Sequence, residues 1–303
     1  MDRIAAMRLF TRIVELGSFS RAAEQLGVAR ASATQTIKQL EARVGVRLLL
    51  RTTRQVTPTV DGSAYYQRCL AILSDLDELE AEFSQVGRHP QGRIRLDMSG
   101  SLCRLVLLPA LPAFCARYPQ IKLEIGVGDR HIDLVREGVD CVLRIGDLRD
   151  MPLVARELTR LEQVTCAAAD YLARHGTPRS VAELEGHLTV DYVSATSGKQ
   201  VPLEFDVGGR IERHVLPAIV TVNNGDAYVA ACKAGFGIIQ LPRYHVSAEI
   251  DGGEFEEILA QHRPPPLPLN VLYPPNRQLS ARVRVFIDWL GELFASNPLT
   301  ARR

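Results

Sequence analysis

The chain has 303 residues, of which 46% are hydrophobic and 23% are charged, a composition typical of a globular protein with two or three domains. The formal net charge of +1 excludes a chain that coats a polyanion along its whole length. No uninterrupted apolar run is long enough to span a membrane, and the N-terminus has no secretory signal. We therefore expect a cytoplasmic protein with no membrane partner.

Positive charge is concentrated in the first fifth of the chain. Residues 1–60 contain ten arginines and lysines but four aspartates and glutamates, so they carry +6 and the remaining residues carry −5. This division indicates an anion-binding N-terminal domain on a mildly acidic body.

The spacing of apolar residues predicts three short helices in this domain. The first ends at Gly17, the second covers about 20–26, and Gly27 permits the turn into a third over about 31–44. The third helix would expose a polar face formed by Arg30, Ser32, Thr34, Gln35, Lys38 and Gln39. Such side chains bind base edges and phosphates, although an ordinary solvated face has the same composition.

The next segment favours DNA binding. Residues 46–51 alternate in part between apolar and basic side chains, a polar turn follows at 52–54, and a second short strand begins at Val56. The pattern predicts a β-hairpin with Arg51 and Arg54 near its tip. Helix, turn, helix and basic hairpin together form a winged helix-turn-helix, whose recognition helix enters the major groove of DNA.

With these elements in place, the sequence resembles the LysR-type transcriptional regulators. The resemblance rests on residues 17–62, GSFSRAAEQLGVARASATQTIKQLEARVGVRLLLRTTRQVTPTVDG, and extends more weakly to LNVLYPPNRQLSARVRVFIDWL at residues 269–290. It implies a sequence-specific DNA-binding domain over 1–58, a double-stranded DNA operator and a small-molecule inducer or co-repressor. It also implies contact with RNA polymerase and a homodimer that assembles to a tetramer.

The polar residues of the domain are assigned two roles. Arg30, Thr34 and Gln35 would contact bases, with Ser32 a lesser candidate, and the expected phosphate contacts are Lys38, Arg51 and Arg54. Relatives often have other residues at position 30 and arginine at position 35. Since arginine favours guanine and glutamine favours adenine, the pair Arg30 and Gln35 predicts an operator that differs from those of relatives.

A long linker helix is predicted over 59–88. Its apolar residues recur at heptad spacing and include Tyr65, Cys69, Ile72, Leu76, Leu79 and Phe83. Such a stripe needs a partner, which is either the body of the same chain or the same helix of a second subunit. The resemblance implies the second partner, and thus a dimer that presents two recognition helices.

Residues 89–303 alternate between strand-like and helical stretches. The order predicts an α/β fold with parallel, doubly wound sheets, divided into lobe I (about 92–161 and 268–303) and lobe II (about 162–267). Two such lobes with a late return of the chain resemble the periplasmic-binding-protein fold, which the family uses as an effector-binding regulatory domain.

In such sheets, ligands bind beyond the carboxyl ends of the strands. The residues expected there are Ser99, Gly100, Ser101, Gly128, Asp129, Ile145, Gly146, Thr196, Ser197, Asn223 and Asn224. The first three open a helix and so suit an anion such as a carboxylate, although serine and glycine at such turns also have purely structural roles. Arg104 and Arg144 are candidate cations, and the charge of the effector stays open.

Other functions find less support. Motifs of nucleotide-binding and hydrolytic enzymes are absent, and the histidines and cysteines lack metal-ligand spacing. We therefore expect no enzyme, no catalytic residue, no metal and no cofactor. A free solute-binding protein would not need the basic N-terminal domain. A thiol redox sensor of the same fold stays an alternative, because Arg104 beside Cys103 would lower the pKa of that thiol.

Overall fold

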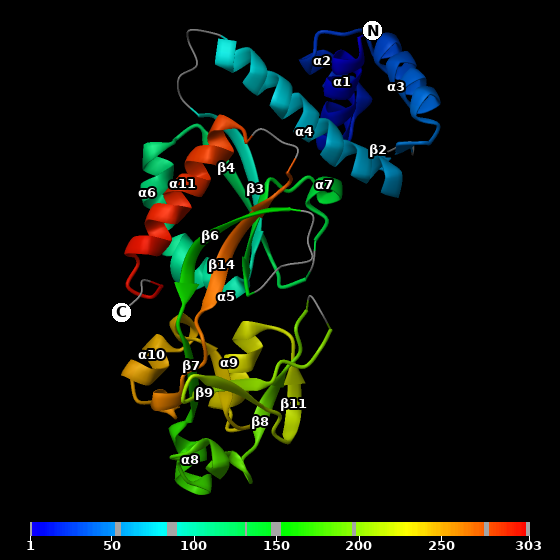
Figure 1. Cartoon of the computed structure of the whole chain (residues 1–303). Helices are drawn as coiled ribbons and strands as arrows, with labels where there is room; N and C mark the ends of the chain where they lie inside the picture. Colours follow the sequence, from blue (N-terminus) through cyan, green and yellow to red (C-terminus); the bar gives the residue numbers. More distant parts are fainter. Residues whose placement is uncertain are drawn as a thin grey trace.

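The computed structural model describes residues 2–51, 56–83, 90–130, 132–146, 153–195, 198–275 and 279–300. An N-terminal domain lies beside a long helix, and two α/β lobes follow below that helix (Figure 1). The elements of the N-terminal domain are α1 (Arg3–Leu16), α2 (Phe19–Gln25), α3 (Arg30–Val44), β1 (Leu49–Arg51) and β2 (Val56–Pro58). The strands β1 and β2 pair antiparallel, so the predicted winged helix-turn-helix is confirmed.

Local sequence sets the ends of these helices. Gly17 ends α1 in the left-handed conformation, with φ of 60°, and the Ser18 hydroxyl accepts the backbone N–H of Arg21 to cap α2. Gly27 has φ of 65° in the turn between α2 and α3, where a side chain would strain the backbone. The helices share one apolar core, which includes Phe10, Ile13, Ala22, Ile37 and Leu48.

The long helix α4 (Val60–Phe83) corrects the predicted heptad stripe at one position. Cys69 is fully buried in the core of the N-terminal domain, and Tyr65 packs edge-on against Phe10, with ring centroids 5.5 Å apart. Both side chains face α1, because α4 starts directly after the hairpin and its first turns complete that core. The fully buried Cys69 therefore cannot form a dimer contact, whereas the half-buried Tyr65 stays a candidate.

The later part of the stripe is different. Ile72 is 48% exposed and Leu76 is half-buried, so both stay candidates for a contact with a second subunit. The side chains of Leu79 and Phe83 lie outside the described residues.

Lobe I is built on a five-stranded sheet with the order β4-β3-β5-β14-β6. Three strands run parallel, namely β3 (Gly92–Met98), β4 (Ile121–Val127) and β5 (Cys141–Ile145), whereas β14 (Leu267–Tyr273) and β6 (Val154–Leu161) are antiparallel to their neighbours. The helices of the lobe are α5 (Gly100–Leu102), a π-helical turn (Cys103–Leu107), α6 (Leu108–Arg117), α7 (Leu134–Glu137) and α11 (Ala281–Ser296).

One helix among the described residues, Gly100–Arg117, is long and apolar enough to cross a membrane by length and composition alone. It comprises α5, the π-helical turn and α6. Its side chains Val106 and Phe114 are fully buried and pack with Ile94 in the core of lobe I. The apolar face of this helix is thus used inside the fold.

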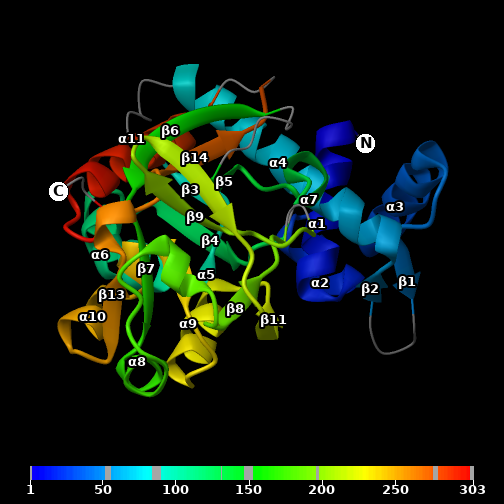
Figure 2. The same ribbon diagram turned by 60° about the horizontal axis from the view of Figure 1, so that its bottom comes forward.

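Lobe II is reached through Glu162, which joins β6 to β7 (Gln163–Ala168). Its other strands are β8 (Thr189–Tyr192), β9 (Leu203–Val207), β10 (Arg210–His214), β11 (Ala218–Val222), β12 (Ile239–Pro242) and β13 (Phe255–Ile258). Its α-helices are α8 (Ala169–His175), α9 (Gly225–Lys233) and α10 (Ser247–Asp251). The chain returns to lobe I through β14, and Figure 2 shows the two lobes from below.

The expected parallel, doubly wound arrangement is confirmed for the centre of lobe I, and β8 and β11 of lobe II also pair parallel, but the expectation is wrong for the three-stranded sheet of lobe II. There the order is β12-β7-β13, and both neighbours of β7 are antiparallel to it. The reason is the position of the crossover at Glu162, where the chain passes from lobe I into lobe II. The strand β7 leads away from Glu162, whereas β12 leads back to it, since Pro242 pairs with Gln163 and the Arg243 N–H bonds the Glu162 carbonyl.

Candidate functional site

The polar face of α3 lies where a DNA-binding surface requires it. Arg30, Ser32, Gln35 and Lys38 are exposed and Thr34 is half-buried, while the opposite face of the helix enters the core. In Figure 2, α3, β1 and β2 lie on the side of the domain that faces away from the two lobes. The predicted base-contacting residues therefore share one accessible surface.

The acid that follows this face, Glu41, has a structural task that the sequence did not reveal. Its Oε1 accepts the backbone N–H groups of Leu48, at 2.9 Å, and of Leu49, at 3.1 Å. The carboxylate thus holds the start of the hairpin against α3. The predicted phosphate contacts Arg51 and Arg54 cannot be placed in the same way, since the side chain of Arg51 and all of Arg54 lie outside the described residues.

The hairpin is also held by the start of α4. The Thr59 hydroxyl donates to the Arg47 carbonyl and accepts the Gly62 N–H, both at 2.8 Å. A Cβ atom on Gly62 would lie 1.8 Å from the Leu48 carbonyl oxygen. Glycine is therefore required at this close approach between helix and hairpin.

A second candidate site is a cavity of about 320 Å³ between the lobes, which is within the size range of small-molecule sites. Five of the predicted residues line it, namely Ser99, Ser101, Asp129, Ile145 and Gly146. Asn224 adjoins it, since its Nδ2 donates to Asp129 at 3.2 Å and its Oδ1 caps α9. Thr196 and Ser197 lie outside the part of the chain that the structure describes.

Three predicted residues do not line the cavity. Gly100 faces Asp226 and Val127, Gly128 bonds the Met98 carbonyl through its N–H, and Asn223 is exposed to solvent. They stand at the ends of strands, as expected, but none of them is among the residues that line the cavity.

Lobe II supplies most of the lining that the sequence did not predict. These residues include Gln163, Tyr192, Tyr228, Gln240, Leu241 and His245. Several come from β7, β12 and the segment after β12, which read in the sequence as ordinary buried strands. Only the pairing of β12 with β7 beside the crossover places them at the cavity.

The two candidate cations are already paired. Arg144 lines the cavity and its Nη2 lies 2.5 Å from Asp97 Oδ1, with both side chains largely buried. Arg104 does not line the cavity and instead pairs with Asp226 of lobe II at 2.8 Å. Neither guanidinium stands alone in the cavity.

A contact between two neutral hydroxyl groups links the lobes beside the cavity. The Ser101 hydroxyl of lobe I lies 3.3 Å from the Tyr244 hydroxyl of lobe II. Burial lowers the pKa of His245, the next residue, to about 4, so its ring is neutral at pH 7. Ser99 Oγ is buried and has no hydrogen-bond partner among the described residues, which leaves a polar anchor for a ligand.

The cysteine next to Arg104 does not have the properties of a redox sensor. Cys103 is buried in the core of lobe I, and burial raises the pKa of its thiol. The neighbouring guanidinium bonds Asp226 instead. The expectation of a lowered thiol pKa is wrong, because Cys103 faces the core while Arg104 faces the other lobe.

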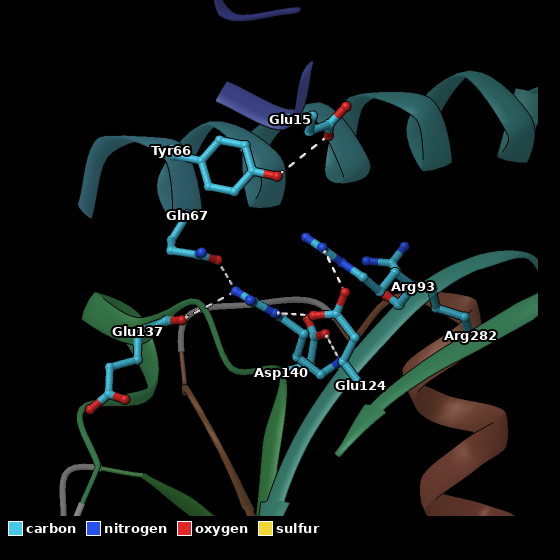
Figure 3. Close-up of polar contacts among 9 residues, drawn as sticks. Glu15, Tyr66, Gln67, Arg93, Glu124, Glu137, Asp140 and Arg282 are labelled. Carbon is cyan, nitrogen blue, oxygen red and sulfur yellow. Dashed lines mark hydrogen bonds and ion pairs between the residues drawn. The ribbon is translucent and has the colours of Figure 1, made fainter. Parts of the chain in front are cut away.

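Lobe I contacts α4 through a cluster of polar side chains (Figure 3). Arg95 of β3 donates to the Gln67 side chain of α4, to the Glu137 carbonyl of α7 and to Glu124 of β4. From the adjacent position on the helix, the Tyr66 hydroxyl donates to Glu15 of α1 at 3.4 Å. A single helix thus connects the N-terminal domain to the sheet of lobe I.

Comparison with known proteins agrees with these features. Residues 4–63 match the family described as bacterial regulatory helix-turn-helix protein, lysR family, and residues 87–295 match the LysR substrate binding domain. The chain therefore belongs to the LysR family. It is a LysR-type DNA-binding transcriptional regulator with an effector-binding domain.

The chain is similar to transcriptional regulators, and the similarity covers nearly the whole length of both chains. YhjC of Escherichia coli K12, described as an uncharacterized HTH-type transcriptional regulator, is 39% identical over 293 residues, which are 96% of this chain and 97% of that protein. An HTH-type transcriptional repressor of Pseudomonas aeruginosa is 37% identical over 300 residues, 98% of this chain and 94% of that one. The structure of CrgA, a LysR-type regulator from Neisseria meningitidis, superposes with a TM-score of 0.60 at 33% identity and covers 96% of this chain and 99% of its own.

Proposed function

We propose that this regulator works in the cytoplasm as a homodimer, or a tetramer built from dimers, on double-stranded operator DNA. A small inducer or co-repressor binds in the cavity between the lobes and changes the relative placement of the N-terminal domains. The DNA-bound oligomer then gains or loses contact with RNA polymerase. The observation that carries this proposal is the cavity itself, because residues of both lobes line it and a ligand there would favour one relative placement of the lobes over another.

The connection between cavity and DNA-binding domain runs through lobe I. Arg144 on β5 lines the cavity, and β5 pairs with β3, which carries Arg95. Arg95 in turn contacts Gln67 on α4. A change in the angle between the lobes would therefore reach α4 through one sheet, which gives the coupling between two sites that allostery requires.

DNA recognition is assigned to the exposed residues of α3. Arg30, Thr34 and Gln35 contact base edges, with Ser32 as a further candidate, while Lys38, Arg51 and Arg54 contact phosphates. This assignment is supported by the shared exposure of the described α3 residues and by the basic charge of the domain. Phosphate contacts release counterions, so binding should fall steeply as salt rises.

The assignment is tested on a DNA site selected from a random library with the full-length protein. Arg30→Ala should reduce discrimination at one base pair by about 1–3 kcal/mol. Lys38→Ala should weaken binding to all sequences alike and reduce the salt slope by about one. Fluorescence anisotropy at several salt concentrations measures both. A flat salt response together with unchanged base preference in Arg30→Ala would show the assignment to be wrong.

A further inference from the structure

The charges around the cavity indicate the kind of molecule that binds there. Among the described lining residues, Asp129 and Arg144 are the charged ones, since the His245 ring is neutral at pH 7. Arg144 is compensated by Asp97, at 2.5 Å. Asp129 accepts a hydrogen bond from the neutral Asn224 amide at 3.2 Å and has no ion pair of its own within that part of the chain.

Several groups that would attract an anion already have partners in the protein. The helix that opens at Gly100 already faces a carboxylate, because a Cβ atom on Gly100 would lie 3.2 Å from Asp226 Oδ2. The other oxygen of Asp226 pairs with Arg104 at 2.8 Å. At the start of α9, Asn224 Oδ1 accepts the N–H groups of residues 226 and 227. The N-terminus of α9 is therefore satisfied without a ligand, whereas the short helix α5 has no side-chain cap and its start faces the Asp226 carboxylate.

The surroundings of Asp129 suit a cation. Burial raises the pKa of its carboxyl, although Arg144 and Asn224 act in the opposite direction, so the ionised form lacks full compensation. Burial, with Asp129 adding to it, raises the pKa of Tyr192 to about 12, which places that tyrosine in the field of the carboxylate. The Tyr192 ring packs on Tyr228, with centroids 5.2 Å apart, and aromatic faces attract cations.

We infer that the cavity binds a small protonated amine on an apolar or aromatic body, whose ammonium group pairs with Asp129 beside the Tyr192 ring. This inference deepens the proposed function, on which it rests, by naming the chemical class of the effector. The apolar side chains Leu143, Ile145 and Leu241 provide contacts for the body of the ligand, and the unpartnered Ser99 hydroxyl gives a further polar anchor. A carboxylate in the same place would lie against Asp129 with no free cation among the described lining residues.

The test uses three probes of one shape, namely benzylamine, benzyl alcohol and benzoate, titrated calorimetrically into the full-length protein. Benzylamine should bind, benzyl alcohol should bind more weakly, and benzoate should not bind. Asp129→Asn should weaken benzylamine by about tenfold or more, as expected for loss of a desolvated charge pair, and should remove the preference for it over benzyl alcohol. Asp170→Asn, which changes an exposed carboxylate on α8, is the matched control and should bind all three probes as the wild type does.

Three results would overturn the inference. They are absence of benzylamine binding to the wild type, benzoate binding as tight as that of benzylamine, and unchanged benzylamine binding in Asp129→Asn. The first two need no variant, so they hold even if Asp129→Asn misfolds.

DNA binding of the same samples separates this inference from the proposed function. If benzoate binds and alters the DNA complex, the cation inference falls and the proposed switch stands. If benzylamine binds but leaves DNA binding unchanged, the inference stands and the proposed switch falls.

Discussion

His245 lies in the segment after β12, close to the crossover between the lobes, and its ring contacts the start of α9. A Cβ atom on Gly225 would lie 2.8 Å from its Cε1, and its ring packs on Tyr244 with centroids 4.2 Å apart. Burial lowers the pKa of the ring to about 4, the nearby Asp226 acting in the opposite direction. The folded protein thus keeps this histidine neutral over a range in which an unfolded chain protonates it.

The pH dependence of stability follows from this pKa. Between pH about 6.5, the unfolded value, and pH about 4, the unfolded state binds the proton and the folded state does not. Stability is therefore full above pH 6.5 and falls as the pH drops, by no more than about 3 kcal/mol. His245→Gln should lack this part of the slope in urea unfolding at pH 7 and pH 4.5. The exposed His175→Gln is the control and should keep it. Equal slopes in wild type and His245→Gln would contradict the prediction.

At the scale of elements, the N-terminal domain depends on the junction of α3, the hairpin and α4. Glu41 holds the hairpin to α3, and Thr59 with Gly62 holds it to α4. The same burial that completes this domain removes Cys69 from the predicted dimer stripe. The heptad spacing predicted which face of the helix is apolar. It did not predict whether that face packs against the same chain or against a second subunit.

Gly62→Ala tests this junction. The added methyl group would lie 1.8 Å from the Leu48 carbonyl oxygen, so α4 and the hairpin must separate. We expect a loss of about 1–3 kcal/mol of stability and weaker binding to every DNA sequence, because the hairpin shifts relative to α3. Thermal unfolding and anisotropy measure the two effects. Ser63→Ala, at the exposed neighbouring position, should behave as the wild type, and a fully stable Gly62→Ala would refute the junction.

At the scale of the whole molecule, α4 joins a DNA-binding domain to an effector-binding lobe in the same chain. Arg95 of the sheet donates to the Gln67 side chain and also to Glu124 and to the Glu137 carbonyl. A Cβ atom on Gly138 would lie 3.5 Å from both the Cβ and the carbonyl oxygen of Gln67, so the turn after α7 packs directly on the helix. The contact between α4 and lobe I is polar and partly buried, which suits an interface that rearranges when the effector binds.

Gln67→Ala removes the α4 side of this contact. A hydrogen bond to a charged group contributes about 1.5–3 kcal/mol, and the part-exposed position reduces this value. We expect faster hydrogen exchange of the amides in α7 and a smaller effect of the ligand on DNA affinity, with ligand binding itself unchanged. Arg68→Ala, at an exposed position on the same helix, is the matched control. Unchanged exchange and a full ligand response would exclude Gln67 from the coupling.

The sequence by itself determined the winged helix-turn-helix, the exposed face of α3, the long helix and the alternating α/β body. These features depend on local periodicity, capping residues and glycine turns. Each of these signals lies within a short stretch of chain, so it can be recognised from the sequence. It also placed Ser99, Ser101, Asp129, Ile145 and Gly146 at the ends of strands, where lobe I lines the cavity.

The tertiary structure alone decided which partners these residues have. The inward position of Cys69, the antiparallel sheet of lobe II and the lining by Tyr192 and His245 depend on how distant segments meet. The same holds for charge: Arg104 and Arg144 looked like anion-binding groups in the sequence, but Asp226 and Asp97 neutralise them in the fold. Pairing between residues far apart in the chain leaves no periodic signal, and here it decides the character of the cavity.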